Sequence, residues 1–277
     1  MSNETVQSGL TALASTAIAE ARHALSNMDD LTRVVRRQIL RPGQISAVFP
    51  KFGALTAAAL TDGNAASNQQ FTATGVTLTP AVNSVARATI TDLADFSSNL
   101  QLQADFGRAA AHAIVKKRNA DIWALFAGFT QSVGTTNTDL TEAALRKARR
   151  MIEESGAGGP IYLAVSPRVV EDLLGLYSTN TNQTADVLRA MSLTEGKLPS
   201  IYGVTPLVIN GVSEDGSGDY ICGMFASDAI GYAESWDIRI EVQRVAASVG
   251  FEIVASSAYA VGEIEDLKGV KVIADGD

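Results

Sequence analysis

The sequence predicts an α+β fold built around one unusually long helix, and three observations lead to that prediction. A stretch rich in Thr, Ala and Asn over Gln44–Thr89 carries few charges and few large apolar residues. A proline-free helical pattern follows over Phe96–Phe129, about three times the average helix length. A compact segment of mixed helices and strands then leads into an acidic, strand-rich end. Because the first stretch cannot form a core alone, this order predicts a subunit that neighbouring copies complete.

Composition narrows the class of protein. The 277 residues are enough for one or two domains with a sizeable core. The net charge of −8 is uneven: residues 1–90 carry seven basic and five acidic groups (+2), residues 91–155 carry eight of each (0), and residues 156–277 carry seven basic and seventeen acidic groups (−10). An acidic second half argues against a sequence-reading DNA-binding domain.

The compartment is predicted from cysteine usage and from the N-terminus. Cys222 is the single cysteine, so no intramolecular disulfide can form, and a reducing cytoplasm is the expected place of synthesis. The first residues, MSNETVQSGL, lack the basic flank and apolar block of a secretory signal. No run approaches the ~18 uninterrupted apolar residues of a membrane span. The sequence therefore predicts no membrane partner.

At the N-terminus we expect a helix over Gly9–Leu40, interrupted at Met28–Asp30 and ended by Pro42. Four arginines share one face of its second half at spacings of three and four: Arg33, Arg36, Arg37 and Arg41. This face is either solvated or a docking surface for the acidic groups of a neighbour or the phosphates of enclosed nucleic acid.

A β-hairpin is predicted next. The segment Phe71–Thr79 alternates apolar and polar residues, Pro80 interrupts it, and Val82–Ile90 is rich in β-branched residues. Between Ile45 and Ile90 we find three charges: Lys51, Asp62 and Arg87. A lone two-stranded arm is marginally stable in water, so we expect it to lie against another surface.

Asp92 or Asp95 is expected to cap the long helix that begins at Phe96. Its apolar residues recur at helical spacing: Leu102, Phe106, Ala109, Ala113, Ile114, Ile122, Leu125, Phe126 and Phe129. The run Lys116-Lys117-Arg118 is typical of a solvated helix face, and we prefer that interpretation to a nucleic-acid signal.

The compact segment begins with a helix over Asp139–Glu154, which Asp139 and Glu142 are expected to cap as a capping box. A buried strand follows at Ile161–Val165, and Ser166 and Pro167 start another helix. Further along we expect a polar loop at Ser178–Gln183, a short helix at Ala185–Met191, and a turn followed by a strand at Ile201–Ile209. Five more strands are expected after them: Tyr220–Phe225, Ile230–Ala233, Ile238–Val245, Phe251–Val261 and Val270–Ala274.

No group of residues predicts a catalytic, cofactor or metal site. His23 and His112 lie far apart in helical patterns, and Cys222 lies in an apolar strand where packing is the expected role. The glycines of Gly156–Gly159 follow a helix and precede a strand. A glycine-rich phosphate-binding loop has the opposite order, because the N-terminus of the following helix must face the anion. Calcium binding by the loop Glu214–Asp219 is the weakest alternative. The sequence also lacks the nucleophile-elbow, P-loop and dinucleotide fingerprints.

The order of these elements resembles the major capsid proteins of tailed bacteriophages, whose Hong Kong 97-type fold is shared with encapsulin shells. Phe71–Ile90 is similar to the extended loop of that family, and Phe96–Phe129 to its spine helix. The segment Ile161–Leu174 resembles the family's strand–Ser/His-Pro–helix unit, and Ile201–Val208 its Gly-Val/Ile-Pro-Val-Val strand.

The resemblance implies four parts and a set of partners. An N-terminal arm would span 1–43 and an extended loop 44–90, the peripheral domain would comprise 91–137 and 235–277, and the axial domain 138–234. The chain would assemble in the host cytoplasm into hexamers and pentamers of an icosahedral head that encloses double-stranded DNA. Scaffolding, portal and cement proteins are implied partners, and contact with DNA would be non-specific.

Two departures from the family pattern shape these expectations. Some members crosslink through a lysine on the extended loop, whereas here no lysine occurs between Lys51 and Lys116. We therefore expect the body and tip of the loop to lack the nucleophile and the shell to be non-covalent. Only about forty residues precede the loop, so we expect any scaffold to be a separate protein. An encapsulin-type compartment is the first alternative function, and a soluble α/β enzyme using Ile161–Asp219 is the second.

Overall fold

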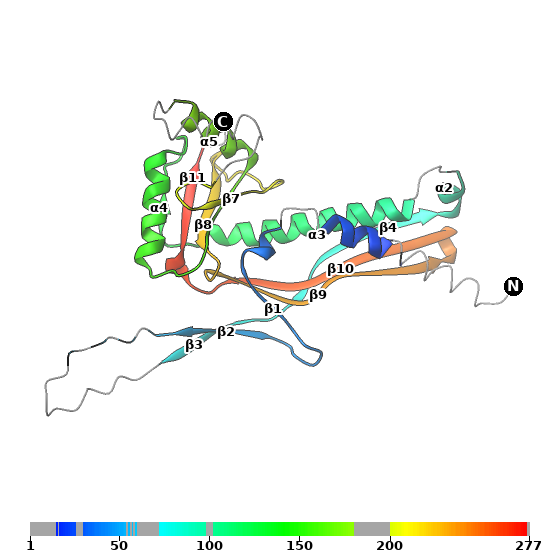
Figure 1. The fold of residues 1–277 in the computed structure, drawn as a ribbon. Coiled ribbons are helices and arrows are strands. Elements are labelled where there is room, and N and C mark those ends of the chain that lie inside the picture. Colours follow the sequence, from blue (N-terminus) through cyan, green and yellow to red (C-terminus); the bar gives the residue numbers. More distant parts are fainter. Residues whose placement is uncertain are drawn as a thin grey trace.

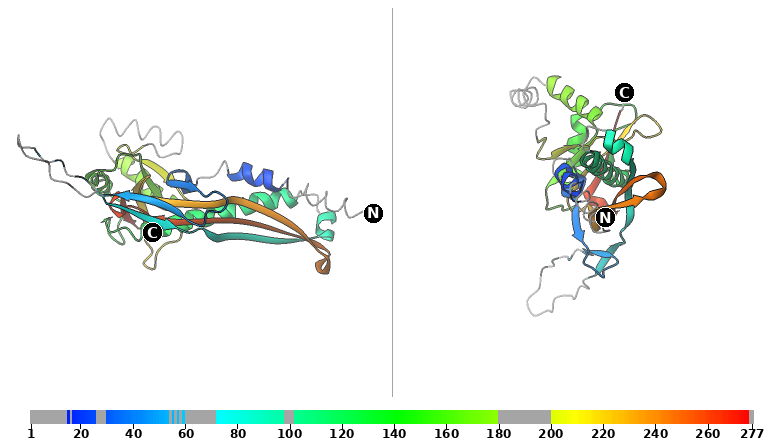
Figure 2. Two further views of the ribbon diagram at one scale, coloured as in Figure 1. Left: turned by 90° about the horizontal axis from the view of Figure 1, so that it is seen from below. Right: turned by 90° about the vertical axis from the view of Figure 1, so that its right-hand side faces the viewer.

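The computed structural model describes residues 15, 17–25, 30–53, 55, 57, 59, 72–97, 102–179 and 200–275. The molecule is elongated, with a long helix lying along a sheet, a compact α/β unit at one end, and a hairpin that projects from the body (Figures 1 and 2). The predicted helix over Ala185–Met191 and the predicted loop tip at 61–64 lie outside the described residues.

The first sheet has the strand order β1-β9-β10-β4. Its strands are β1 (Arg36–Ile39), β9 (Ile230–Val245), β10 (Gly250–Glu263) and β4 (Ala81–Thr91). The pair β1–β9 is parallel and the other pairs are antiparallel. The short 3₁₀ helix η2 (Ala246–Ser248) joins β9 to β10, and the two strands form a long ribbon (Figure 1).

The long helix α3 (Leu102–Phe126) packs along this sheet, mainly against β10 and β4. Helical residues 17–25 lie against it from the other side (Figures 1 and 2), where Ala17 and Ala21 pack with Ala110 and Ala111. Its 25 residues correspond to roughly 37 Å at about 1.5 Å per residue. The predicted helix over Phe96–Phe129 is therefore present but shorter, and α2 (Asp92–Ser97) is a separate short helix.

The second sheet forms the compact unit and has the order β5-β11-β8-β6-β7. Its strands are β5 (Ser132–Val133), β11 (Gly269–Ala274), β8 (Tyr220–Ala226), β6 (Ile161–Val165) and β7 (Thr205–Val208). Helices α4 (Glu142–Glu154) and α5 (Pro167–Thr179) belong to the same unit. The 3₁₀ helix η3 (Asp266–Lys268) precedes β11. The strands and the Ser-Pro helix start predicted for this segment are confirmed.

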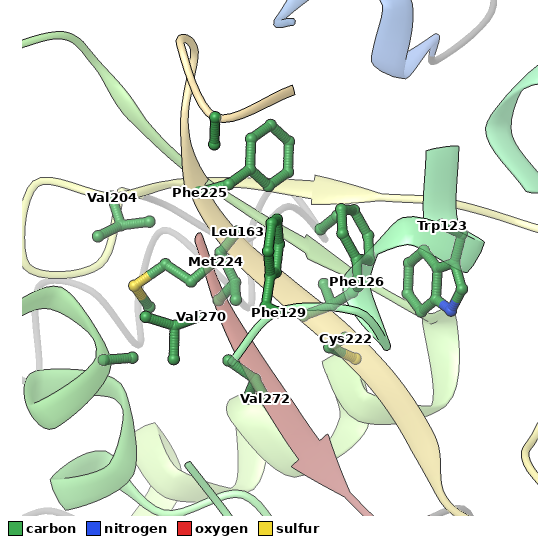
Figure 3. Close-up of a cluster of buried hydrophobic side chains, with 14 of the residues drawn as sticks. Trp123, Phe126, Phe129, Leu163, Val204, Cys222, Met224, Phe225, Val270 and Val272 are labelled. Atoms are coloured by element: carbon green, nitrogen blue, oxygen red, sulfur yellow. The ribbon is translucent and has the colours of Figure 1, made fainter. Parts of the chain in front are cut away.

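The core lies where the end of α3 enters the second sheet (Figure 3). Phe126 lies 5.5 Å from Phe225 and 6.1 Å from Phe129, measured between ring centroids. Glycine is needed beneath these rings, because a Cβ on Gly223 would lie 2.5 Å from Phe126 and one on Gly269 would lie 2.3 Å from Phe129. The aromatic end of α3 therefore joins the two sheets into one body.

The predicted helix over residues 31–40 is wrong. Leu31–Arg33 form the 3₁₀ helix η1, and Arg36–Ile39 form β1. The neighbouring strand β9 supplies hydrogen-bond partners that a helix would have found internally, and Leu40 continues this pairing by donating to the carbonyl of Glu234 at 2.8 Å. Successive side chains of a strand point to opposite faces, so the four arginines do not share a helical face.

The pairing predicted for the hairpin is also wrong, although both strands exist. The strand β3 (Ala73–Leu78) pairs with β2 (Ala47–Phe52), while β4 pairs with β10. Sequence reasoning missed β2 because Pro50 and Lys51 interrupt its apolar pattern. The hairpin therefore begins at Ala47 and contains Lys51, so the expectation that the body of the loop lacks a lysine is wrong.

The cap of α4 differs from the prediction as well. Thr141 is the N-cap, and its side chain accepts a hydrogen bond from the Ala144 N–H at 3.3 Å. Asp139 lies two residues before that cap and does not form the predicted capping box with Glu142. Threonine competes well for the cap position, and the hydroxyl closest to the first turn takes it.

Candidate assembly interface

The base of the hairpin is anchored in the body of the molecule. Ala47, Phe49 and Leu78 are buried, and they pack with Leu40, Ala233 and Ile264. These last three residues lie beside β1, on β9 and just after β10, so the hairpin grows directly from the first sheet. Glycine on β10 permits the contact, because a Cβ on Gly262 would lie 2.5 Å from Leu78. The direction in which the hairpin leaves the body is therefore fixed by packing.

The rest of the hairpin is bare. Beyond Phe49, the strand β2 is exposed at every position, and β3 is exposed or half-buried before Leu78. Seven of the twelve large exposed apolar side chains in the described part of the chain lie on the hairpin or on the strands at its base. We call these the hairpin residues: Ile39, Ile45, Val48, Phe52, Leu55, Val82 and Val85. Exposed apolar side chains gathered in this way mark a surface that another molecule covers.

The strand β4 extends this surface along its free edge. It is eleven residues long and pairs on one side with β10, so its other edge offers unpaired backbone groups within the described structure. Arg87 is its only charged side chain, and Arg87 forms an ion pair with Glu252 of β10. A long edge with so little charge is a template for a further strand or an adjoining chain.

A small charged group marks the base of the hairpin. Burial raises the pKa of Glu263, the nearby Asp266 carboxylate raises it further, and the Lys51 ammonium opposes both effects. Asp266 also accepts a hydrogen bond from the Thr130 N–H at 2.8 Å. The one lysine of the described hairpin strands, Lys51, is therefore close enough to Glu263 to influence its pKa, and its own side chain is exposed on β2.

The run Lys116-Lys117-Arg118 behaves as predicted at two of its three positions. Lys116 and Lys117 are exposed, and Lys117 pairs with Asp121 at 2.6 Å. Arg118 contradicts the prediction, because its side chain is 3% exposed and forms an ion pair with Asp237 at 2.6 Å. It also donates to the Ser257 hydroxyl at 2.6 Å. The helix turns this position toward the ribbon, and no pattern in the run itself distinguishes it from its neighbours.

The other sequence candidates do not come together as a site. His23 and His112 are exposed on the N-terminal helix and on α3, and no cluster of three metal-ligating side chains occurs in the described ranges. Cys222 is buried in β8, and burial raises its pKa to about 12. Its thiol therefore stays protonated at neutral pH and is a poor nucleophile.

The acidic loop Glu214–Asp219 uses its carboxylates to hold its own backbone. Asp215 accepts hydrogen bonds from the Ser217 and Asp219 N–H groups at 2.7 and 3.1 Å. Asp219 is buried and accepts from the Asn137 N–H at 2.8 Å. These contacts give the loop a structural role. Among the described residues, no helix is both long and apolar enough to cross a membrane.

Comparisons with known proteins agree with this geometry. The family model described as "Phage capsid protein" matches residues 86–273, which are 188 of the 277 residues. A search of curated proteins finds no match. The matched range starts within β4 and ends within β11, so it contains the long helix and, apart from β1 and the first part of β4, nearly all of both sheets.

Solved structures resemble the chain over most of its length. The capsid of Ralstonia phage GP4 has a TM-score of 0.67 at 8% identity and covers 88% of this chain and 87% of that chain. The Mycobacterium phage Che8 structure has a TM-score of 0.65 at 16% identity, with coverage of 83% and 84%. A virus-like particle from Pyrococcus furiosus has a TM-score of 0.60 at 12% identity, with coverage of 93% and 98%.

These likenesses confirm the predicted α+β fold of Hong Kong 97 type. Sequence identities this low demonstrate the fold and no more. The family model adds the independent evidence of a sequence match over more than half of the residues. The chain therefore belongs to the phage capsid protein family.

Proposed function

We propose that the chain is a major capsid subunit that assembles into the hexamers and pentamers of an icosahedral phage head. The observation that carries this proposal is the hairpin, which is anchored at its base by Phe49 and Leu78 and bare beyond them. An isolated two-stranded arm is marginally stable in water. A second copy of the chain covers the hairpin residues in the assembled head.

The domain division follows the same proposal. The arm spans 1–43, the extended loop 44–90, the peripheral domain 91–137 and 235–277, and the axial domain 138–234. Support comes from the two sheets, since β10 and most of β9, within the peripheral range, belong to the first sheet, and β6, β7 and β8, within the axial range, to the second. The strand β4, which lies within the proposed extended loop except for Thr91, pairs with β10 and so belongs by hydrogen bonding to the first sheet. The strand β11 lies in the range assigned to the peripheral domain, but it pairs with β8. By hydrogen bonding, its six residues therefore belong to the sheet of the proposed axial domain.

The partners and the location follow from the assembled state. Packaged double-stranded DNA contacts the shell without sequence preference, and scaffolding, portal and cement proteins act at other stages of assembly in the host cytoplasm. The subunit has a structural role in the virion and no catalytic one. Contacts between copies around a ring are heterologous and close by rotation. The bare apolar hairpin supports a shell held together by non-covalent contacts.

A substitution on the hairpin tests the proposal. Phe52 is 58% exposed, so Phe52→Asp removes little intramolecular packing but places a charge on the surface that a neighbour covers. We expect the purified variant to remain folded by circular dichroism and to form no particles in negative-stain electron microscopy. The matched control Phe52→Leu keeps an apolar side chain and should form particles like those of the wild type.

Two results would contradict the proposal. Wild-type protein that stays monomeric at all concentrations and salt conditions would exclude a self-assembling shell. Particles of Phe52→Asp with normal yield and size would show that the hairpin does not lie against a neighbour.

A compartment that encloses protein cargo is the second candidate, because the virus-like particle from Pyrococcus furiosus shares the fold over 93% of this chain. The contents of native particles distinguish the two. Nuclease-resistant DNA in purified particles supports the phage head, whereas a stoichiometric co-purified protein without DNA supports a compartment.

A further inference from the structure

A polar pocket of about 220 Å³ lies where the N-terminal helix, η1, β1 and α3 meet. The hairpin residues do not line it. Its charged lining comprises four arginines and two aspartates: Arg22, Arg33, Arg37, Arg118, Asp30 and Asp237. The arginines come from four different elements, which are residues 17–25, η1, β1 and α3. Side chains far apart in the sequence thus place guanidinium groups around one small volume.

Both aspartates of the pocket have a partner in the chain, although Asp237 Oδ1 is buried and accepts no hydrogen bond within the described structure beside its ion pair. Asp30 caps η1 and accepts a hydrogen bond from the Thr32 N–H at 2.9 Å. Asp237 pairs with Arg118 at 2.6 Å. Four guanidinium groups and two carboxylates leave the lining with a charge of +2. Glu234, which pairs with Arg37 at 2.6 Å, lowers this balance to +1 when it is included. The pocket therefore keeps a net positive charge.

Arg118 adds a donor that the protein leaves unsatisfied. Its side chain is 97% buried, yet its Nε–H has no hydrogen-bond acceptor within the described structure. Buried polar groups in native proteins are nearly always hydrogen-bonded, and an unmade bond is costly. An acceptor in the pocket that Arg118 lines would remove this cost.

We propose that this pocket binds a phosphate-type oxyanion. Guanidinium groups recognise phosphate oxygens through paired, charge-assisted hydrogen bonds. A planar carboxylate is satisfied by one such fork, whereas a tetrahedral anion can accept donors from several residues, and these four arginines line the pocket from four different elements. The anion is either inorganic phosphate or a phosphodiester of nucleic acid. The net charge of +2 over residues 1–90, against −10 over 156–277, favours the nucleic acid.

Anion binding by the pocket does not depend on the proposed function. Only the assignment of the anion to packaged DNA rests on the proposed function. The test uses the double variant Arg22→Gln/Arg33→Gln, because both side chains are exposed. The matched control is Arg41→Gln/Arg239→Gln, which loses the same charge from exposed positions that do not line the pocket. Thermal unfolding of the full chain is compared in phosphate, chloride and acetate at equal ionic strength.

Phosphate should raise the unfolding midpoint of the wild type and of the control above the value in chloride. The pocket variant should bind phosphate about tenfold or more weakly, as expected for the loss of charge-assisted hydrogen bonds. The unfolding midpoint in chloride reports whether the variant folds, and Arg22→Gln alone provides a milder change. Equal phosphate effects in variant and control, no phosphate effect in the wild type, or acetate acting as strongly as phosphate would each overturn the proposal.

Fluorescence anisotropy with a short labelled DNA duplex identifies the source of the anion. Weaker duplex binding by the pocket variant than by the control assigns the site to nucleic acid. Equal duplex binding, combined with weaker binding of inorganic phosphate, assigns it to free phosphate, and both results support the oxyanion site. Electron microscopy of the same samples scores particle formation separately. Intact particles without phosphate binding would therefore overturn the pocket proposal but not the capsid proposal. Phosphate binding without particles would overturn the capsid proposal but not the pocket proposal.

Discussion

At the scale of single residues, Arg118 links the long helix to the ribbon. Its guanidinium lies 5.7 Å from the ring centroid of Tyr259, pairs with Asp237, and donates to the Ser257 hydroxyl. Tyr259 in turn donates to Asp121 on the same helix at 2.6 Å. A polar network of this kind stabilises a structure when its members are satisfied, and it becomes costly when one partner is removed.

We expect Arg118→Met to lower the free energy of unfolding by about 1–3 kcal/mol, because it leaves the buried Ser257 hydroxyl without its charged donor. Urea unfolding of the unassembled subunit measures this change. Lys117→Gln is the control on the adjacent position, where loss of an exposed ion pair should cost no more than about 0.5 kcal/mol. Equal effects of the two substitutions would show that the network does not join helix and ribbon.

At the scale of elements, the type and the ends of helices and strands depend on hydrogen-bond partners that the local sequence pattern does not reveal. The arginine-rich segment 33–41 has helical spacing, yet its central residues Arg36–Ile39 form a strand because β9 offers a parallel partner. The helix α4 is predicted correctly as an element, but its first turn is capped by the nearest competent hydroxyl rather than by the more acidic residue upstream.

The cap assignment leads to a direct prediction for α4. Thr141→Ala should destabilise the subunit by about 1 kcal/mol, because the Ala144 N–H loses its acceptor. Asp139→Ala, which removes the residue first expected to cap, should change the stability by less than about 0.5 kcal/mol. Thermal unfolding of the two variants decides between these caps, and a larger loss for Asp139→Ala would restore the original capping box.

At the scale of the whole molecule, the hairpin is a branch whose β2 and β3 side chains beyond Phe49 and before Leu78 are exposed or half-buried among the described residues. The two sheets and α3 share a continuous packed body, whereas the hairpin contributes little to that body beyond Phe49. Seven of the twelve large exposed apolar side chains in the described part of the chain lie at this branch, and Lys51 is the one charged side chain on the strands β2 and β3. If the hairpin lies against a neighbouring copy as proposed, we expect that contact to be mainly apolar and hydrogen-bonded.

Salt resistance of the particles follows from this character. Raising the ionic strength from about 0.1 M to 1 M shortens the Debye length from about 10 Å to 3 Å, and it leaves apolar burial intact. We expect particles to persist across this range in light-scattering and size-exclusion measurements. Dissociation in high salt would show that ion pairs, rather than the hairpin residues, hold neighbouring subunits together.

Local pattern was sufficient for much of the fold. The strand predicted at Ile238–Val245 lies within β9, where Arg239 and Glu241 are exposed and alternate with the more buried Ile238, Ile240 and Val242. The long proline-free run predicted α3, and Ser166 and Pro167 predicted the start of α5. These features are local because period, capping and proline chemistry act within a few residues along the chain.

What the sequence by itself determined is the kind and order of the elements, the acidic second half, and the low charge of the segment that forms the hairpin. The tertiary structure alone decided that β2 pairs with β3, that β4 pairs with β10, and that Arg118 is buried beside Asp237. It also decided that four distant arginines surround one pocket. The physical reason is that strand pairing and burial depend on partners tens to hundreds of residues away, and no local period encodes the identity of such a partner.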